Sequence, residues 1–208
     1  MDVDCPGIDN IIKEIMASYK GILAHTNKWE GGLVYHKNEG QWTNRGIQWT
    51  TFKQLAPKLI NLPSPTVEDL KALTQAQWEK FVEYFWNKAT YNNAINDQAA
   101  ANIMFLALWG SGSYGIRDMQ KAIGTTADGI VGPITVQKIN ANKKAAEILY
   151  QALDKRYRLL ASVNPASYSQ YLKGWLNRLS ELKPDKIAAI SIGAIAAIGL
   201  IYYLATNR

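Results

Sequence analysis

A chain of 208 residues with 48% hydrophobic side chains is long enough to bury a substantial core, which excludes a disordered protein. The formal net charge of +6 favours a polyanionic partner, namely nucleic acid, anionic lipid or bacterial cell wall. The single cysteine, Cys5, excludes an internal disulfide, and the two isolated histidines, His25 and His36, argue against a metal site. We therefore expect neither a metal ion nor another cofactor.

The N-terminal region contains one stretch that could carry chemistry. The first ten residues, MDVDCPGIDN, are acidic and lack an apolar core, so they do not predict a cleaved secretory signal. Residues 28–48, KWEGGLVYHKNEGQWTNRGIQ, then place the carboxylate of Glu30 between a tryptophan and two glycines. The same stretch adds a second acid, Glu39, and a hydroxyl, Thr43. It fits either an acid-catalysed hydrolase site or a tight turn.

The middle of the chain predicts one helix after another. Residues 62–66, LPSPT, indicate a turn, and Thr74 with Gln77 forms a capping-box pattern ahead of aromatic residues at helical spacing. Residues 99–109, AAANIMFLALW, are apolar nearly all round, which predicts a buried helix. We expect the glycines of residues 110–115 to end that helix.

Further helices are expected after residue 115. A short one stops at Gly124, and in the motif DGIVGP the pair Asp128 and Gly129 predicts a turn, with Pro133 opening the next helix. Residues 145–160 have the spacing of an amphipathic helix. No sustained two-residue alternation marks a strand, so the predicted fold class is mainly α.

The C-terminal residues 187–205, IAAISIGAIAAIGLIYYLA, contain no charge. Their length and composition predict a transmembrane helix, whereas a buried core helix is the alternative. Basic residues Lys183 and Lys186 precede this segment and only Arg208 follows it, which would leave the main domain in the cytoplasm.

Four motifs in this order, WEGG, TNRGI, DGIVGP and KGWLNRL, resemble glycoside hydrolase family 108, the N-acetylmuramidases of bacteriophages and bacteria, over roughly residues 17–180. The resemblance implies a lysozyme-like, mainly helical fold that cleaves the bond between N-acetylmuramic acid and N-acetylglucosamine in peptidoglycan. It implies a catalytic region at residues 1–112 and a predicted peptidoglycan-binding helical region at residues 113–182, ahead of the transmembrane segment at 187–205.

The glutamate of the family's EGG motif, its catalytic acid, corresponds to Glu30. Such an acid must stay protonated near neutral pH, and apolar neighbours, here Trp29 and Leu33, favour the neutral carboxyl group. Gly31 and Gly32 would allow a sharp turn and leave space for a sugar ring.

The remaining candidate residues have open alternatives. Glu39 is either the second carboxylate that activates water or a solvated loop acid. Thr43 either orients a water or sugar hydroxyl, or caps a turn. The aromatic side chains of Tyr35, Trp42 and Trp49 are candidates for sugar stacking, with a purely structural role as the alternative.

The chain departs from the family pattern in two places. The segment YHKNEGQW lacks the aspartates usual after EGG. In the predicted buried helix, Phe105 or Leu106 stands where family members carry an aspartate, and Trp109 stands at the asparagine of an NSG motif. Both departures remove polar groups from the expected cleft.

Two functions follow. The first is a phage or prophage endolysin, or a virion-associated wall hydrolase, held at the inner membrane by its C-terminal helix and released by a holin-like or virion partner. The second is a catalytically degenerate, membrane-anchored protein that binds peptidoglycan or serves a structural role. Specific nucleic-acid binding is not expected, because no basic recognition helix or RNA-binding motif is present.

Overall fold

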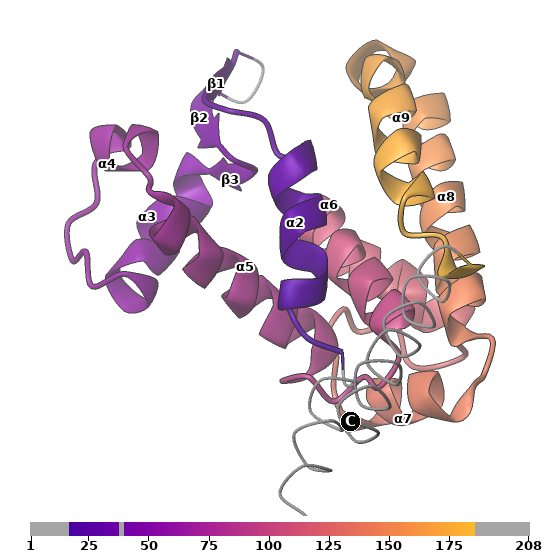
Figure 1. Ribbon diagram of the computed structural model, residues 1–208. Coiled ribbons are helices and arrows are strands. Elements are labelled where there is room, and N and C mark those ends of the chain that lie inside the picture. The colour runs from indigo at the N-terminus through magenta and orange to yellow at the C-terminus, as the bar shows by residue number, and fades with distance from the viewer. Residues whose placement is uncertain (1–16, 38–39, 186–208) are drawn as a thin grey trace, which may run out of the picture. The chain divides into compact units, whose positions relative to one another are not determined.

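The computed structural model describes residues 17–37 and 40–185 (Figure 1). Glu39 and the predicted membrane segment at 187–205 lie outside these residues. The chain forms two compact units, residues 18–88 and a second unit made of residues 89–185 with Ala17. Within the described part, no helix combines the length and the apolar character needed to cross a bilayer.

The first unit combines helices with a small antiparallel sheet whose strand order is β1-β2-β3. In chain order its elements are α2 (Lys20–Trp29), β1 (Val34–His36), β2 (Gln41–Asn44), β3 (Ile47–Gln48), α3 (Trp49–Leu59), α4 (Val67–Lys71) and α5 (Gln75–Thr90). The sheet was not predicted, because strands of two to four residues are too short to show a two-residue alternation.

Aromatic side chains form the core of this unit. Phe52 of α3 stacks on Phe81 of α5 with ring centroids 5.7 Å apart, and Trp78 and Trp86 are fully buried beside them. This fits the helical spacing of the aromatic residues after Thr74, because one stripe of such a helix faces inward. Burial of such large rings is the main stabilising term of a unit this small.

Both helices after the LPSPT turn begin with a capping box. At α5 the prediction is confirmed, since the Thr74 N–H donates to Gln77 Oε1 (3.0 Å) and the Gln77 N–H donates to Thr74 Oγ1 (3.2 Å). The short helix α4 was not predicted, although Thr66 and Asp69 form the same reciprocal pair. Hydrogen bonds from the Thr66 hydroxyl and backbone N–H lower the pKa of the Asp69 carboxyl group.

In the described residues of the second unit, all regular secondary structure is helical. It contains α6 (Gln98–Ala122), α7 (Pro133–Ala141), α8 (Ala145–Val163) and α9 (Pro165–Ser180), and α8 packs against both α6 and α9 (Figure 1). Residues 99–107 of α6 are all buried, which confirms the predicted buried helix. The amphipathic helix expected at residues 145–160 is confirmed as α8, with Leu149, Leu153 and Tyr157 buried.

The glycines after Trp109 break the helix, as predicted. Gly112 has a non-helical φ of 57° and ψ of −147°, which suit a residue without a side chain, so α6 consists of two helical segments that meet at a kink. Beyond this kink the backbone approaches itself closely, because a Cβ atom on Gly115 would lie 2.1 Å from the carbonyl oxygen of Ala107. The two glycines therefore separate the buried first segment from the second, which runs to Ala122.

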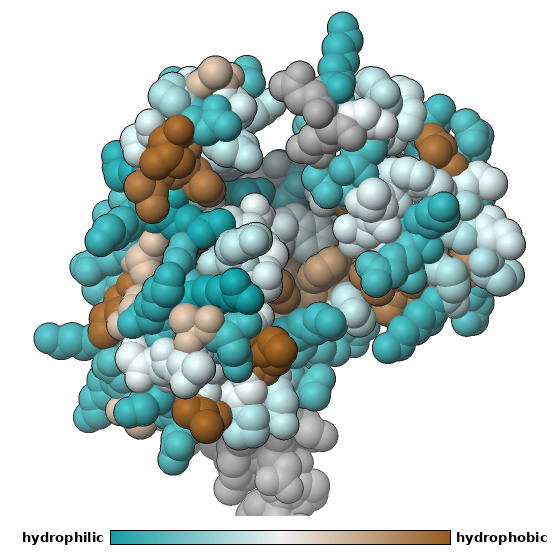
Figure 2. Space-filling view, turned by 180° about the vertical axis from the view of Figure 1, so that it is seen from behind, coloured by the Kyte–Doolittle hydropathy of each residue, from teal (hydrophilic) through white to brown (hydrophobic). Residues whose placement is uncertain are grey.

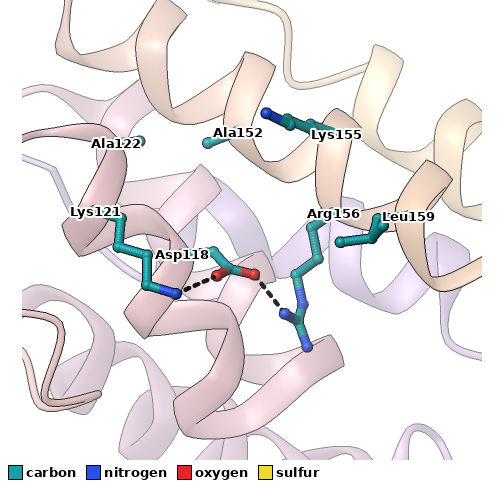
Figure 3. Close-up of a pocket in the computed structure, with 7 residues that line it drawn as sticks. All are labelled: Asp118, Lys121, Ala122, Ala152, Lys155, Arg156 and Leu159. Carbon is teal, nitrogen blue, oxygen red and sulfur yellow. Dashed lines mark hydrogen bonds and ion pairs between the residues drawn. The ribbon is translucent and has the colours of Figure 1, made fainter.

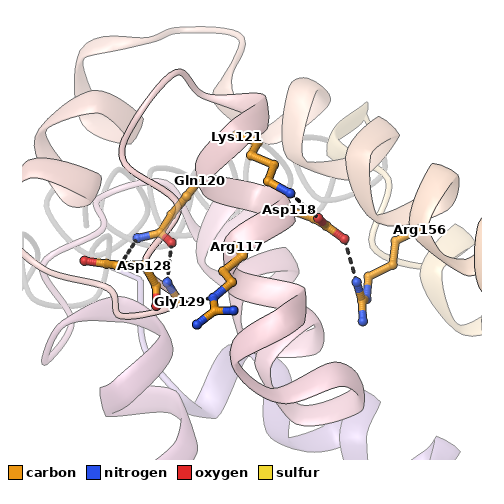
Figure 4. A network of polar contacts seen from close by, with 7 residues as sticks. All are labelled: Arg117, Asp118, Gln120, Lys121, Asp128, Gly129 and Arg156. Atoms are coloured by element: carbon orange, nitrogen blue, oxygen red, sulfur yellow. Dashed lines mark hydrogen bonds and ion pairs between the residues drawn. The ribbon is translucent and has the colours of Figure 1, made fainter.

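The DGIVGP turn forms as predicted. Gly129 adopts a φ of 84°, and Pro133 is the first residue of α7. The buried side chain of Gln120 holds the turn: its Nε2 donates to Asp128 Oδ1 (2.8 Å) and to Ile130 O (2.9 Å), and its Oε1 accepts from the Gly129 N–H (2.8 Å) (Figure 4). Hydrogen bonds from the Ile130 N–H and Gln120 lower the pKa of the Asp128 carboxyl group. This network gives the motif a structural role.

Candidate active site

Glu30 is the residue at which α2 ends. Its backbone N–H donates to Thr26 O (2.9 Å), and its own φ and ψ of −83° and 115° are extended, so the chain leaves the helix here and continues to β1 (Figure 1). The Glu30 side chain is half-buried. The carbonyl end of a helix carries a partial negative charge, which opposes ionisation of a carboxyl group placed there.

The two glycines after Glu30 leave open space. A Cβ atom added to Gly31 or Gly32 would meet no atom within 4 Å, and both residues are exposed. The chain bends at Glu30 and again at Gly32, in line with the expected turn, although neither glycine has a positive φ. The backbone conformation therefore does not require glycine, whereas the open space fits the expected room for a sugar ring.

The apolar surroundings expected for Glu30 are only partly in place. Trp29 is half-buried, and the Lys28 ammonium group lies 5.2 Å from the centre of its ring. Leu33 is 41% exposed, so its side chain faces solvent instead of shielding a carboxyl group.

The sheet brings two predicted stacking residues together. Tyr35 of β1 is paired with Trp42 of β2, and their ring centroids are 5.2 Å apart. Tyr35 is 46% exposed, which leaves its ring accessible. The Trp42 ring is half-buried, with the Lys71 ammonium group 4.7 Å from its centre. Of this pair, Tyr35 presents the more accessible surface.

Thr43 lies on the other face of the sheet from this aromatic pair, because successive residues of a strand point to opposite sides. It is paired with Val34 on one side and with Gln48 on the other. Its hydroxyl oxygen is buried, and among the described residues it has no hydrogen-bond partner. A buried hydroxyl without a partner is costly, which is typical of a group that bonds a ligand or an ordered water.

Trp49, the third predicted stacking residue, opens α3. Its ring centroid lies 6.2 Å from that of Phe52, which belongs to the buried aromatic core of the first unit. Trp49 therefore contacts that core, whereas Tyr35 and Trp42 contact each other.

Arg45 has a role that the sequence did not indicate. Arg45 and Gly46 connect β2 to β3, with φ values of 49° and 77°. The Arg45 guanidinium donates to Asn27 Oδ1 in the last turn of α2 and to Gln75 Oε1 at the start of α5. It also lies 4.4 Å from the centre of the Trp78 ring, whose Nε1–H donates to the Arg45 carbonyl oxygen (2.9 Å).

Asn44, beside Arg45, anchors the same hairpin. Its buried side chain donates through Nδ2 to the carbonyl oxygens of Leu70 (2.8 Å) and Lys71 (3.3 Å) at the end of α4. The TNRGI motif thus fixes β2 to α2, α4 and α5. The sequence signal for this hairpin was the glycine of the Arg45–Gly46 pair. Two-residue hairpin turns need residues with positive φ, which glycine adopts readily.

A separate cavity of about 300 Å³ lies in the second unit, between α6 and α8 (Figure 3). Its lining includes Lys155 and Leu159 of α8. Asp118 is paired there with Arg156 (Oδ2 to Nη1, 2.5 Å) and with Lys121 (3.7 Å) (Figure 4). Because one acid is matched by three cations, the cavity is positively charged, but none of its residues belongs to a predicted site.

No group of three or more histidine, cysteine, aspartate or glutamate side chains among the described residues is arranged to hold a metal ion. The chemistry that the described residues offer is therefore that of Glu30, Thr43 and the aromatic side chains of the hairpin. These match the needs of acid-catalysed glycoside cleavage better than those of nucleophilic attack by a serine or cysteine.

Comparison with protein families identifies this arrangement. Residues 23–112, which include Glu30 and the whole hairpin, match the model of glycosyl hydrolase 108. Residues 114–180 match the predicted peptidoglycan domain. Residues 23–112 thus form a glycoside hydrolase family 108 region. The chain is accordingly a peptidoglycan-directed glycoside hydrolase, and the resemblance seen in its motifs is confirmed.

The solved structure of SagA from Brucella abortus has a similar fold. It superposes with a TM-score of 0.65 and 22% sequence identity, over 82% of this chain and 94% of that one. At this level of identity the similarity concerns the fold alone. No curated protein matches the chain.

Proposed function

We propose that this family 108 enzyme cleaves the N-acetylmuramic acid to N-acetylglucosamine bond with Glu30 as the general acid. The observation that carries the proposal is the position of Glu30, half-buried at the carbonyl end of α2 and followed by two glycines with open space around them. This places a carboxyl group that can serve as a general acid beside room for a sugar ring.

The reaction is a displacement by water. Glu30 donates its proton to the glycosidic oxygen as the bond from that oxygen to the anomeric carbon breaks, while the oxygen of water forms a new bond to that carbon. A second carboxylate accepts the proton of the water, and we assign this role to Glu39. Thr43 orients the water, and its buried, unpartnered hydroxyl supports that role.

The aromatic residues of the hairpin divide into two roles. The exposed Tyr35 ring supports sugar stacking, with Trp42 behind it as the packed partner of the pair. Trp49 is assigned to the core through its contact with Phe52. Because Thr43 and the Tyr35–Trp42 pair occupy opposite faces of the sheet, they contact different groups of the substrate.

The deciding experiment is release of reducing sugar from purified peptidoglycan by the full chain and by its Glu30→Gln variant. Glutamine keeps the shape of the side chain and removes the proton that it donates, so the rate should fall by about two or more orders of magnitude. Glu68→Gln is the matched control, because it removes an exposed carboxylate of α4 in the same unit. Equal rates for Glu30→Gln and the unsubstituted chain would reject Glu30 as the acid.

A fold retained only for binding is the second candidate function. It is favoured by Phe105 and Leu106, which are buried in α6 where the family resemblance implies an aspartate. The Phe105 ring is also stacked on Trp109, 5.4 Å away, so this stretch of α6 is packed with apolar groups. This candidate holds if neither the unsubstituted chain nor Glu30→Gln releases sugar while both sediment with the wall.

We further propose that the enzyme acts as a phage or prophage endolysin, or as a virion-associated wall hydrolase. In this scheme, residues 187–205 tether it to the inner membrane, and a holin-like or virion partner brings it to its substrate. The support is the uncharged apolar sequence of that segment.

A further inference from the structure

One face of α9 carries three aromatic side chains. Tyr168, Tyr171 and Trp175 follow one another at intervals of three and four residues, which places them on the same side of the helix. Their rings form one cluster, with the centroids of Tyr168 and Tyr171 lying 5.8 Å and 6.0 Å from that of Trp175. We call these three residues the aromatic face of α9.

Packing of the protein accounts for only the inner part of this face. The Trp175 ring lies 5.4 Å from the ring of Tyr157, a residue of α8 that is only 2% exposed, and this contact joins the two helices. Tyr168 and Tyr171 are 37% and 44% exposed, so more than a third of each residue stays in contact with water after folding and could be buried by a ligand.

Further exposed apolar side chains lie close by in the chain. Leu159 and Val163, in the last two turns of α8, are both more than half exposed. Figure 2 shows apolar groups gathered over the end of the α8–α9 hairpin, on a surface that is otherwise largely hydrophilic. Among these groups, the rings of Tyr168, Tyr171 and Trp175 are the ones in mutual contact, and exposed apolar groups that cluster mark a binding surface more often than isolated ones do.

The aromatic face of α9 is chemically better suited to bind the sugar rings of a cell wall than its other components. Flat aromatic rings complement the C–H faces of pyranose rings, and the phenolic hydroxyls at their edges can bond to sugar hydroxyls. Residues 165–180 contain no aspartate or glutamate, so the helix does not repel an anionic polymer. The polymer is indicated by the match of residues 114–180 to the predicted peptidoglycan domain.

We propose that the aromatic face of α9 is a second glycan-binding surface, on which sugar rings of the peptidoglycan strand stack against Tyr168 and Tyr171. The proposal rests on the proposed function, because the polymer bound here is the substrate of the enzyme. Binding at this face holds the chain on the wall through residues other than those that carry out hydrolysis.

The test measures binding without turnover. The full chain carrying Glu30→Gln is sedimented with purified peptidoglycan, alone and with the double change Tyr168→Leu and Tyr171→Leu. Leucine keeps apolar contact with Trp175 and favours helix, so the fold should be retained and is checked by the melting temperature. Since two aromatic contacts are lost, the dissociation constant should rise roughly tenfold.

The matched control is the double change Tyr168→Phe and Tyr171→Phe, which keeps both rings and should bind within about twofold of the parent. Glycan strands stripped of stem peptides should compete for binding, whereas free stem peptides should not. The proposal is overturned if the leucine variant binds as tightly as the phenylalanine variant, or if stem peptides alone displace the protein. Failure of the muramidase function is detected separately, by release of reducing sugar from the unsubstituted chain.

Discussion

Glu30 and Gly31 are neighbours in the chain, but their expected roles in the active site differ. In the proposed mechanism Glu30 supplies a proton, whereas Gly31 supplies only space, because a Cβ there would touch no atom of the described residues within 4 Å. An alanine at Gly31 should therefore leave the melting temperature nearly unchanged while it hinders a bound sugar.

For Gly31→Ala we expect a fall in kcat/KM of about tenfold or more, which corresponds to roughly 1.4 kcal/mol of lost transition-state binding. Gly132→Ala is the control, since a Cβ at Gly132 also meets nothing within 4 Å and the residue lies outside the candidate active site. Steady-state kinetics on soluble glycan fragments, together with thermal melting, decide the matter. Unchanged kinetics would show that the space beside Glu30 is not occupied by substrate.

At the scale of elements, Arg45 links the last turn of α2 to α5 and to the hairpin. Lysine at this position keeps a cation near the Trp78 ring, but its single ammonium group lacks the planar fork that reaches Asn27 and Gln75 together. Because Asn27 lies one turn before Glu30, loss of the link should affect the placement of the acid.

For Arg45→Lys we expect kcat to fall about tenfold with little change in KM, together with a melting temperature lowered by a few degrees. Arg158→Lys, which changes an exposed arginine of α8, should alter neither quantity. If Arg45→Lys lowers only the melting temperature, the residue supports the fold without positioning Glu30.

The helices and the hairpin of this unit show which features could be predicted from the sequence and which could not. Helices with clear caps, such as the one after Thr74, could be predicted because the capping residues and the apolar stripe are local in sequence. The sheet could not, since its strands are too short to show a period and are held by distant partners such as Leu70 and Trp78. Glu30 was found by its motif, whereas the clustering of Tyr35 with Trp42 depends on the strand register.

At the scale of the whole molecule, the membrane tether that we propose can be tested on its own. The uncharged sequence of residues 187–205 is the candidate. An arginine at the centre of a spanning helix costs about 2.5–3.5 kcal/mol on insertion scales.

We therefore expect Ile195→Arg to move a substantial fraction of the full chain from the membrane pellet to the soluble fraction. Asn207→Arg adds the same charge outside the apolar segment and should leave the distribution unchanged. Equal partitioning of the two variants would indicate that residues 187–205 do not lie in lipid.

The bend in α6 also affects how such enzymes could be assembled by recombination. The two matched family regions meet within this helix, one ending at residue 112 and the other starting at residue 114. An exchange of C-terminal regions between relatives would thus join two halves of a helix instead of two loops. Such an exchange would reproduce the bend only if the recipient keeps glycine at position 112 and the donor supplies glycine at position 115, so each partner has to contribute one of the two glycines.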